Sequence, residues 1–194
     1  MKTVLSLLLL SLSISAFSQS EHNFNIRLNY LSPMMNTLNV QSEFAFNARH
    51  SLNVGFFKGF ASSSSTGVEG WGVFTEFRFY LSGTAGAGGW YIAPYLRYRD
   101  YLFWTNYERT ENGVVVERGK DAFPTHNVDV GAAFGKQWLA GKHILIELYM
   151  GPGIRTQNFT LYHNPHHLEE ALINAIRESI PITFRFGSTI GYRF

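Results

Sequence analysis

A regular alternation of apolar and polar residues constrains the fold most, because neighbouring side chains on a β-strand point to opposite faces. In residues 23–31, for example, Phe24, Ile26 and Leu28 alternate with Asn25 and Arg27. The segments with this period are residues 23–31, 37–47, 51–60, 71–81, 90–103, 127–139, 143–151 and 181–194. The pattern predicts eight strands, each with one apolar and one polar face.

Two positions interrupt the alternation. Between Gly55 and Lys58 the period is lost, which predicts a β-bulge. Pro94 lies inside the fifth segment, and a proline in a strand usually marks an edge or a bulge because it cannot donate to the ladder.

The connections between the segments alternate in length. On the side where both termini would lie, they are the short stretches NARH, SGTAGAGG and AGK. On the other side they are SPMMN, ASSSSTGVE, residues 104–126 and residues 155–180, of which only the first is short. The connection 104–126 has an Asn112-Gly113 turn signal between β-prone flanks and so predicts a hairpin extension. Short turns at one end and long loops at the other are typical of outer-membrane barrels. The expected fold is all-β: an eight-stranded antiparallel up-and-down transmembrane β-barrel.

Aromatic residues gather at the short-turn end of the apolar faces. They come from strands that are scattered along the chain, and they are Phe24, Phe79, Trp90, Trp138, Tyr192 and Phe194. Transmembrane barrels carry aromatic belts of this kind where the bilayer meets water. We therefore expect these six residues to form a belt at one rim.

The polar faces decide whether the apolar faces point inward or outward. They carry mainly Asn, Gln, Thr, Tyr and Gly, and charged residues are only 15% of the chain, against about 25% in typical soluble domains. This composition favours a membrane barrel over a soluble ligand carrier of the lipocalin type. The charged residues that would then point inward are Arg27, Glu43, Glu76, Arg78, Arg97, Arg99, Asp129, Glu147, Arg185 and Arg193.

A barrel of eight strands has just enough interior for side chains, and unpaired buried charges cost several kcal/mol each. We expect the inward charges to form a salt-bridge core that closes the lumen, with Glu76, Arg97, Glu147 and Arg185 near its centre. Lys58 and Lys136 fall on the apolar face, close to strand ends from which they could reach the interface.

The N-terminus carries the features of a secretory signal peptide: Lys2, an apolar run to Leu10, and small residues at Ala16 and Ser18. We place the signal peptide at residues 1–18 and a single barrel domain at 19–194. The chain contains no cysteine, and its net charge is only +2. These values argue against disulfides, thiolate metal sites and a nucleic-acid partner.

Three stretches carry a family resemblance: YIAPYLRYRDY, FGKQWLAGKHILIELYMGPGIR and IGYRF. They resemble an uncharacterised family of small Gram-negative barrels assigned as a domain of unknown function, within the wider OmpA or OmpW sort. The resemblance implies the fold and an outer-membrane location, but no activity. The end of the chain, with Tyr192 and Phe194, also resembles the signal that the barrel-assembly machinery reads.

The last long connection holds the most chemically suggestive residues. Asn164 could cap a short helix running to about Ser179, with Pro165 at its first position. The nearby side chains that could ligate zinc or copper are His163, His166, His167, Glu169 and Glu170. Their spacing matches no established metal signature, so we expect an ordinary polar loop helix and no metal or other cofactor. A pH-responsive or partner-binding cluster is a further alternative.

A lipid-modifying enzyme is the alternative from a different class. His126 and Ser188 are candidates by residue type, but they should lie at different depths, and the chain lacks a G-x-S-x-G turn. GTAGAGG has no following helix or lysine and so does not predict a phosphate loop. No catalytic role is expected.

The sequence thus predicts a monomeric outer-membrane barrel with a structural or surface-interaction role. Its expected partners are outer-membrane lipids, lipopolysaccharide and the barrel-assembly machinery. A narrow or lateral passage for small solutes is the alternative.

Overall fold

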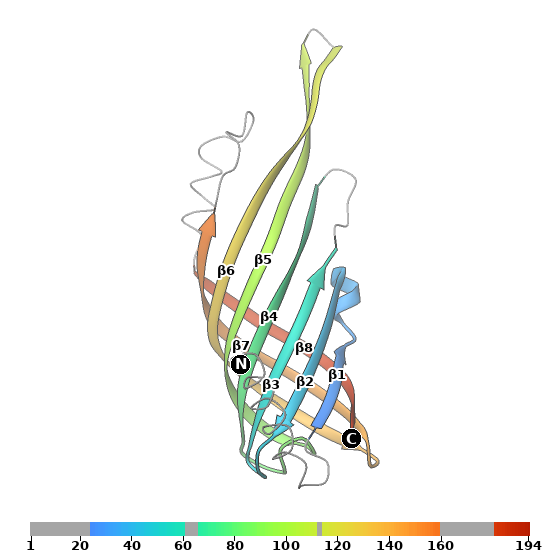
Figure 1. Ribbon diagram of the computed structural model, residues 1–194, viewed down its shortest axis with the longest axis vertical. Helices are drawn as coiled ribbons and strands as arrows, with labels where there is room; N and C mark the ends of the chain where they lie inside the picture. The colour runs from blue at the N-terminus through green and yellow to red at the C-terminus, as the bar shows by residue number, and fades with distance from the viewer. Residues whose placement is uncertain (1–23, 61–65, 112–113, 160–180) are drawn as a thin grey trace, which may run out of the picture.

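The strands form one closed antiparallel barrel in the order β1 to β8 (Figure 1). This computed structural model describes residues 24–60, 66–111, 114–159 and 181–194. The strands are β1 Phe24–Asn29, β2 Thr37–Ala45, β3 His50–Gly59, β4 Thr66–Tyr80, β5 Gly89–Glu111, β6 Val114–Ala140, β7 Ile144–Phe159 and β8 Ile182–Arg193. The predicted eight-stranded antiparallel barrel is confirmed.

The pairing of β1 with β8 closes the barrel. Asn25 is opposite Arg193 and Asn29 is opposite Thr189, in continuous antiparallel register. Within the barrel wall, as far as the structure describes it, closure gives every strand a neighbour on both sides, which removes the unpaired backbone groups that would otherwise template aggregation. Pro94 therefore lies in an interior strand, with its side chain exposed on the outer surface.

The two faces of each strand divide as the alternation predicts. Arg27 and Asn25 are buried in the lumen, whereas Ile26 and Leu28 between them are exposed on the outer surface. The same reversal of the usual burial pattern continues around the barrel, where the exposed side chains of the barrel wall are mainly Leu, Ile, Val, Phe and Trp. The interior of this molecule is polar and its exterior is apolar.

The two ends of the barrel differ in their connections. We call the end with the C-terminus and the links 46–49, 81–88 and 141–143 the turn end, and the opposite end the loop end. At the loop end β5 and β6 rise well beyond the other strands as a paired hairpin (Figure 1). The β1–β2 link is also at this end, and it contains the 3-10 helix η1 Ser32–Met35.

Three details differ from the sequence-based prediction of strand limits. Residues 104–126, a connection predicted to form a hairpin extension, mostly continue β5 and β6, which stay paired as far as Glu111 opposite Val114. The predicted hairpin extension is therefore confirmed, and its two strands satisfy each other's backbone groups beyond the barrel wall. In the same way β4 starts at Thr66 and β7 runs to Phe159.

The bulge predicted between Gly55 and Lys58 is absent, because β3 keeps one register against both neighbours. The polarity pattern is lost there for another reason: Phe57 points inward and lies against the ring of Phe74, with centroids 6.5 Å apart. Gly55 is also inward, where a Cβ atom would overlap the Phe74 ring. Aromatic packing inside the lumen therefore looks like a break in the sequence pattern.

The predictions for the N-terminus and for the last connection fall on residues that the structure does not describe. The signal peptide at 1–18 lies outside the described residues, and so does the helix predicted in the last connection, residues 160–180. Among the described residues there is no helix long and apolar enough to cross a membrane.

Candidate functional site

The charged lumen is the candidate site, because it holds most of the charged side chains that the barrel buries. Of the ten charged residues predicted to point inward, all except Arg193 point into the lumen. These nine are Arg27, Glu43, Glu76, Arg78, Arg97, Arg99, Asp129, Glu147 and Arg185. They form two groups rather than one. We call them the ion-paired core and the mouth cluster.

The ion-paired core lies toward the turn end and consists of Arg27, Glu43, Glu76, Arg78, Glu147 and Arg185. Arg27 Nη1 lies 3.1 Å from Glu43 Oε2 and 3.0 Å from Glu147 Oε1. Arg78 contacts the same two carboxylates at 3.3 and 2.6 Å, and a third, Glu76, at 2.8 Å. Three arginines thus face three glutamates, so the group is neutral.

Neutral side chains complete the hydrogen bonds of this core. Tyr80 and Tyr91 donate from their hydroxyls to Glu43 Oε1 and Glu147 Oε1, each at 2.7 Å. Gln137 Nε2 donates to Glu43 Oε2 at 3.2 Å, and Thr189 donates to Glu147 Oε2 at 2.9 Å. Burying charges is tolerable only when they are both paired and hydrogen-bonded. The carboxylates of Glu43 and Glu147 meet both conditions.

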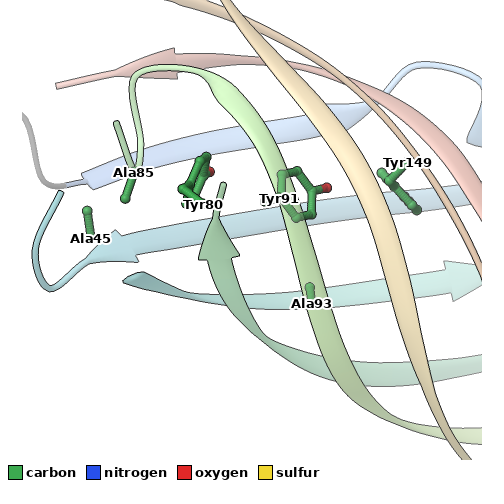
Figure 2. Close-up of a cluster of buried hydrophobic side chains, with 6 residues drawn as sticks. All are labelled: Ala45, Tyr80, Ala85, Tyr91, Ala93 and Tyr149. Carbon is green, nitrogen blue, oxygen red and sulfur yellow. The ribbon is translucent and has the colours of Figure 1, made fainter. Parts of the chain in front are cut away.

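Aromatic rings fill the space around the ion pairs. Tyr80, Tyr91 and Tyr149 follow one another along the lumen (Figure 2). The Arg78 guanidinium lies over the ring of Tyr91, 4.4 Å from its centroid. The alternation places these tyrosines on the polar faces, but it does not identify them as part of the core, since a tyrosine carries no charge.

The link 81–88 closes the lumen at the turn end. Ala85 is buried beside Ala45 and Tyr80 (Figure 2), and its N–H donates to the carbonyl of Ala48 at 3.0 Å. Gly83 has a φ of +76°, and a Cβ atom on it would overlap the carbonyl of Gly88. The glycines of GTAGAGG therefore allow a tight turn that packs under the barrel.

Arg185 marks the boundary between the two groups. It is ion-paired with Glu76 through Nη1, and its side chain is 4% exposed. Its guanidinium lies 4.2 Å from the ring centroid of Phe74 and 4.6 Å from that of Tyr149. Ring faces therefore provide much of its surroundings.

The mouth cluster lies above this boundary, toward the loop end, and is built around Asp129. Arg97 Nε and Arg99 Nη2 donate to its carboxylate at 2.8 and 2.9 Å. Arg155 Nε donates to it at 3.0 Å, and Arg155 Nη2 also donates to Thr183. Arg97 therefore belongs to this cluster and not, as expected, to the centre of the core with Glu76, Glu147 and Arg185.

Arg155 is not recognised from the sequence, because it falls in the stretch predicted to be the last connection. The inward residues that precede Arg155 on β7 are Gly151 and Gly153, and they have no side chain that would identify this face as polar. The outward residues Met150 and Ile154 are apolar, and this pattern could have predicted that the strand continues to Arg155. Arg193 lies half-buried at the turn end, where it donates to the carbonyl of Lys142 at 3.3 Å.

The six residues of the predicted belt lie on the outer surface at the turn end. Phe24 stacks on Phe194 with centroids 5.6 Å apart, and Phe194 contacts Tyr192 at 5.1 Å. Trp90 stacks on Phe134 at 5.0 Å. Further rings at this rim, which sequence analysis did not assign to the belt, are Phe44, Phe46, Phe77 and His143.

Both lysines on the outer face lie near a rim. Lys136 Nζ is 4.6 Å from the ring centroid of Trp90 and 5.0 Å from that of Trp138. Lys58 is exposed at the loop end of β3, opposite Trp71 in the register. Their amines can therefore reach water without crossing the apolar surface.

The candidates for enzyme chemistry are not brought together. Ser188 is opposite Leu148, which is opposite Lys136 on β6. His126 lies ten residues along β6 from Lys136, which is about 33 Å at 3.3 Å per residue. Ser188 donates to the carbonyl of Glu147, and His126 lies 3.4 Å from Asp100.

The predicted metal candidates His163, His166, His167, Glu169 and Glu170 lie outside the described residues. Elsewhere in the chain, as far as the structure describes it, no group of three His, Asp or Glu side chains is placed to hold a metal ion.

Comparison with known proteins supplies a family. The family model described as "Protein of unknown function (DUF3575)" matches residues 4–182. No curated protein matches the sequence. Among solved structures, the N-terminal β-barrel domain of Pseudomonas aeruginosa OprF aligns with a TM-score of 0.39 and 11% identity, over 91% of this chain and 100% of that chain.

Proposed function

Because the chain belongs to the DUF3575 family, whose function is unknown, we propose a function from the geometry of the barrel itself. The protein is a small outer-membrane β-barrel of the OmpA or OmpW kind, and its lumen is closed by ion pairs. It acts as a monomer in a structural or surface-interaction role, through the connections at its loop end. It has no catalytic role.

The outer surface supports a membrane location. Outward side chains of β5 from Trp90 to Tyr98 are apolar or aromatic, and the next outward residue is Asp100. This row of nine residues is within the range of about 9–11 residues that a tilted strand needs to cross a bilayer. Aromatic rings flank this row at both ends, with the belt at the turn end and the Trp71–Tyr98 contact at the loop end.

One observation carries the proposal of a closed lumen: Arg27, Glu43, Arg78 and Glu147 have no exposed side-chain surface at all. They come from four different strands and meet across the interior. An aqueous channel along the axis would leave them accessible to water. Ala85 and the 81–88 link close the turn end as well.

The hairpin of β5 and β6 supports the surface role. It extends beyond every other strand at the loop end (Figure 1), where it would stand clear of the bilayer. Lipopolysaccharide, outer-membrane lipids and the barrel-assembly machinery are the proposed partners. The C-terminal rings of Tyr192 and Phe194 pack together on the outer surface, where an assembly factor can reach them.

Membrane insertion is tested by fractionation and by gel migration. The mature chain is expected in the outer-membrane fraction, to require detergent for extraction, and to migrate differently in a gel before and after boiling. A protein that remains in the aqueous fraction without detergent contradicts the proposal.

The closed lumen is tested by single-channel recording in planar bilayers. The wild type is expected to show no steady conductance. The Glu76→Gln variant breaks the ion pair with Arg185, and Lys142→Gln, in an exposed turn, is its control. Steady conductance of the wild type that changes with Glu76→Gln but not with Lys142→Gln would favour the passage for small solutes instead.

The absence of a catalytic role is tested on lipids. Overexpression is expected to leave lipid A and phospholipids unchanged in mass spectra. A modified lipid that disappears with His126→Ala would assign the enzyme class instead.

A further inference from the structure

A cavity of about 240 Å³ lies in the lumen above the ion-paired core, toward the loop end. Three arginines contribute to its wall: Arg97, Arg99 and Arg185. The rest of the wall is partly aromatic and includes Phe57, Phe74, Tyr101 and Tyr149. This combination of guanidinium groups and rings in one cavity raises the question of what it could bind.

The cavity carries an excess of positive charge. In the mouth cluster, three arginines share the single carboxylate of Asp129, which is itself fully buried. The ion-paired core beneath it is neutral, with three arginines and three glutamates. Among the lumen side chains that the structure describes, two positive charges therefore remain without a counter-charge, and both belong to the mouth cluster.

Two hydrogen-bond donors in the cavity wall lack an acceptor. Nη2 of Arg185 and Nε of Arg99 are buried atoms without a hydrogen-bond partner. Arg185 is 4% exposed, so water from the bulk does not reach it freely. A buried donor without an acceptor is costly, and the cost is greater for a charged group. An acceptor of negative charge, placed in the cavity, would remove this cost for both.

The surroundings of Arg185 leave these donors free for a ligand. Its guanidinium is held partly by ring faces, those of Phe74, Tyr149 and Tyr95, at 4.2, 4.6 and 5.3 Å from their centroids. Stacking uses the face of the guanidinium, whereas the N–H groups point outward in its plane. Arginine in this arrangement can bind the planar or tetrahedral oxygens of a carboxylate or phosphate.

We propose that the cavity binds a small organic anion, with its carboxylate or phosphate group on Arg97, Arg99 and Arg185 and its apolar part against Phe57, Phe74 and Tyr101. The site is reached from the loop end, since the ion-paired core and the 81–88 link close the other end. Arg97 and Arg99 are 14% and 12% exposed, so this approach is open to them.

The site requires the folded barrel but neither a bilayer nor a closed lumen. If the chain forms a barrel with heat-modifiable migration but does not bind the anion, this proposal alone is overturned. A chain that forms no barrel in detergent overturns the proposed function as well. The two failures are therefore distinguishable.

The test is a titration of the detergent-solubilised full chain with phenyl phosphate and with benzoate, followed by calorimetry. Inorganic phosphate tests the charge alone, and phenyltrimethylammonium tests the ring alone. We expect saturable binding of one stoichiometric equivalent of phenyl phosphate or benzoate, weaker binding of inorganic phosphate, and no binding of the cation. Equal and non-saturating signals from all four probes would overturn the site.

Variants locate the binding. Arg99→Gln is expected to weaken phenyl phosphate binding by about tenfold or more, since a hydrogen bond between charged groups is lost. Arg193→Gln, the same change at the turn end, is the matched control and should leave affinity unchanged. Asp129→Asn removes the competing carboxylate and should strengthen binding. Unchanged affinity for phenyl phosphate in both Arg99→Gln and Asp129→Asn would contradict the proposal. If one of the two variants does not fold, unchanged affinity in the other contradicts it.

A lipid headgroup is the other source of a phosphate. Purified lipopolysaccharide is expected not to displace phenyl phosphate, because the cavity lies within the barrel wall and not on its outer surface. Displacement at stoichiometric amounts would overturn the assignment to a small soluble anion.

Discussion

The two charged groups in the lumen differ although the same strands build both. In the ion-paired core, Arg27 and Arg78 each contact more than one carboxylate and have no exposed side-chain surface. In the mouth cluster, the exposed fraction rises to 26% for Arg155, and one carboxylate serves three arginines. Where water is excluded the charges are balanced, and where water can enter an imbalance remains.

Desolvation explains this difference. An unpaired charge far from water loses several kcal/mol of hydration, whereas a partly exposed one keeps much of it. The core can therefore hold arginine only with a full set of acids, and the mouth is under no such constraint. The first group is suited to closing the lumen, and the second to meeting an anion.

Removing one cation from the core should have the largest effect on stability. Arg78→Met removes one ion-pair partner from each of Glu43, Glu76 and Glu147, which are buried away from water. We expect the free energy of unfolding to fall by about 3–5 kcal/mol. Urea unfolding in lipid vesicles, followed by tryptophan fluorescence, measures it. Lys142→Met, in an exposed turn, is the control and should change little. A loss under about 1 kcal/mol for Arg78→Met would show that the core is hydrated.

A charged side chain placed on the outer wall should reduce stability nearly as much as the loss of a core cation. The outer wall lies outside both charged groups, so this change tests the bilayer and not the lumen. Leu96 is 48% exposed, midway along the apolar row of β5. Leu96→Arg is expected to cost about 2–4 kcal/mol in lipid vesicles. Val115→Arg, in the hairpin beyond the wall, should stay within about 0.5 kcal/mol. Equal effects at the two positions would contradict a bilayer around Leu96.

Glycine-to-alanine substitutions should show that the lumen is packed more tightly beside the ion-paired core than at Gly59 on the loop side. The expected effects on stability are smaller than those above. A Cβ atom at Gly135, beside the core, would overlap the ring of Tyr91, so Gly135→Ala should cost about 1–3 kcal/mol. At Gly59, on the loop side, the nearest atoms would be 4.0 Å from a Cβ. Gly59→Ala should therefore be neutral, or stabilise by about 0.4–1 kcal/mol. The same unfolding assay measures both, and an equal loss would mean that the lumen is uniformly packed.

The smallest effect is expected in the mouth cluster. Arg99→Met leaves Asp129 paired with Arg97 and Arg155, so stability should change by no more than about 1 kcal/mol. The change should also depend on salt, since ions reach this level and screen it over about 10 Å at 0.1 M. Unfolding at 0.05 and 0.5 M NaCl checks this. A salt-independent loss as large as that of Arg78→Met would abolish the distinction between the groups.

The sequence predicted the faces of the strands better than their lengths. Arg27, Glu43 and Glu147 could be assigned to the lumen because each lies in a clean alternation of polar and apolar residues. Arg155 could not, since Gly151 and Gly153 interrupt that alternation. Phe57 produced the wrong prediction of a bulge because it is an apolar residue on a polar face. Strand ends depend on the pairing partner, which the local pattern does not contain.

The amino-acid sequence by itself determined the eight strands, the face on which most of the lumen charges lie and the row of aromatic residues at the turn end, because all three follow from a period of two along the chain. Only the tertiary structure decided which charges meet. Closure of the barrel brings Arg27 to Glu147, 120 residues away, and the stagger of the strands separates Arg97 from Glu76. Pairing across a closed interior depends on register, and register is a property of the whole barrel.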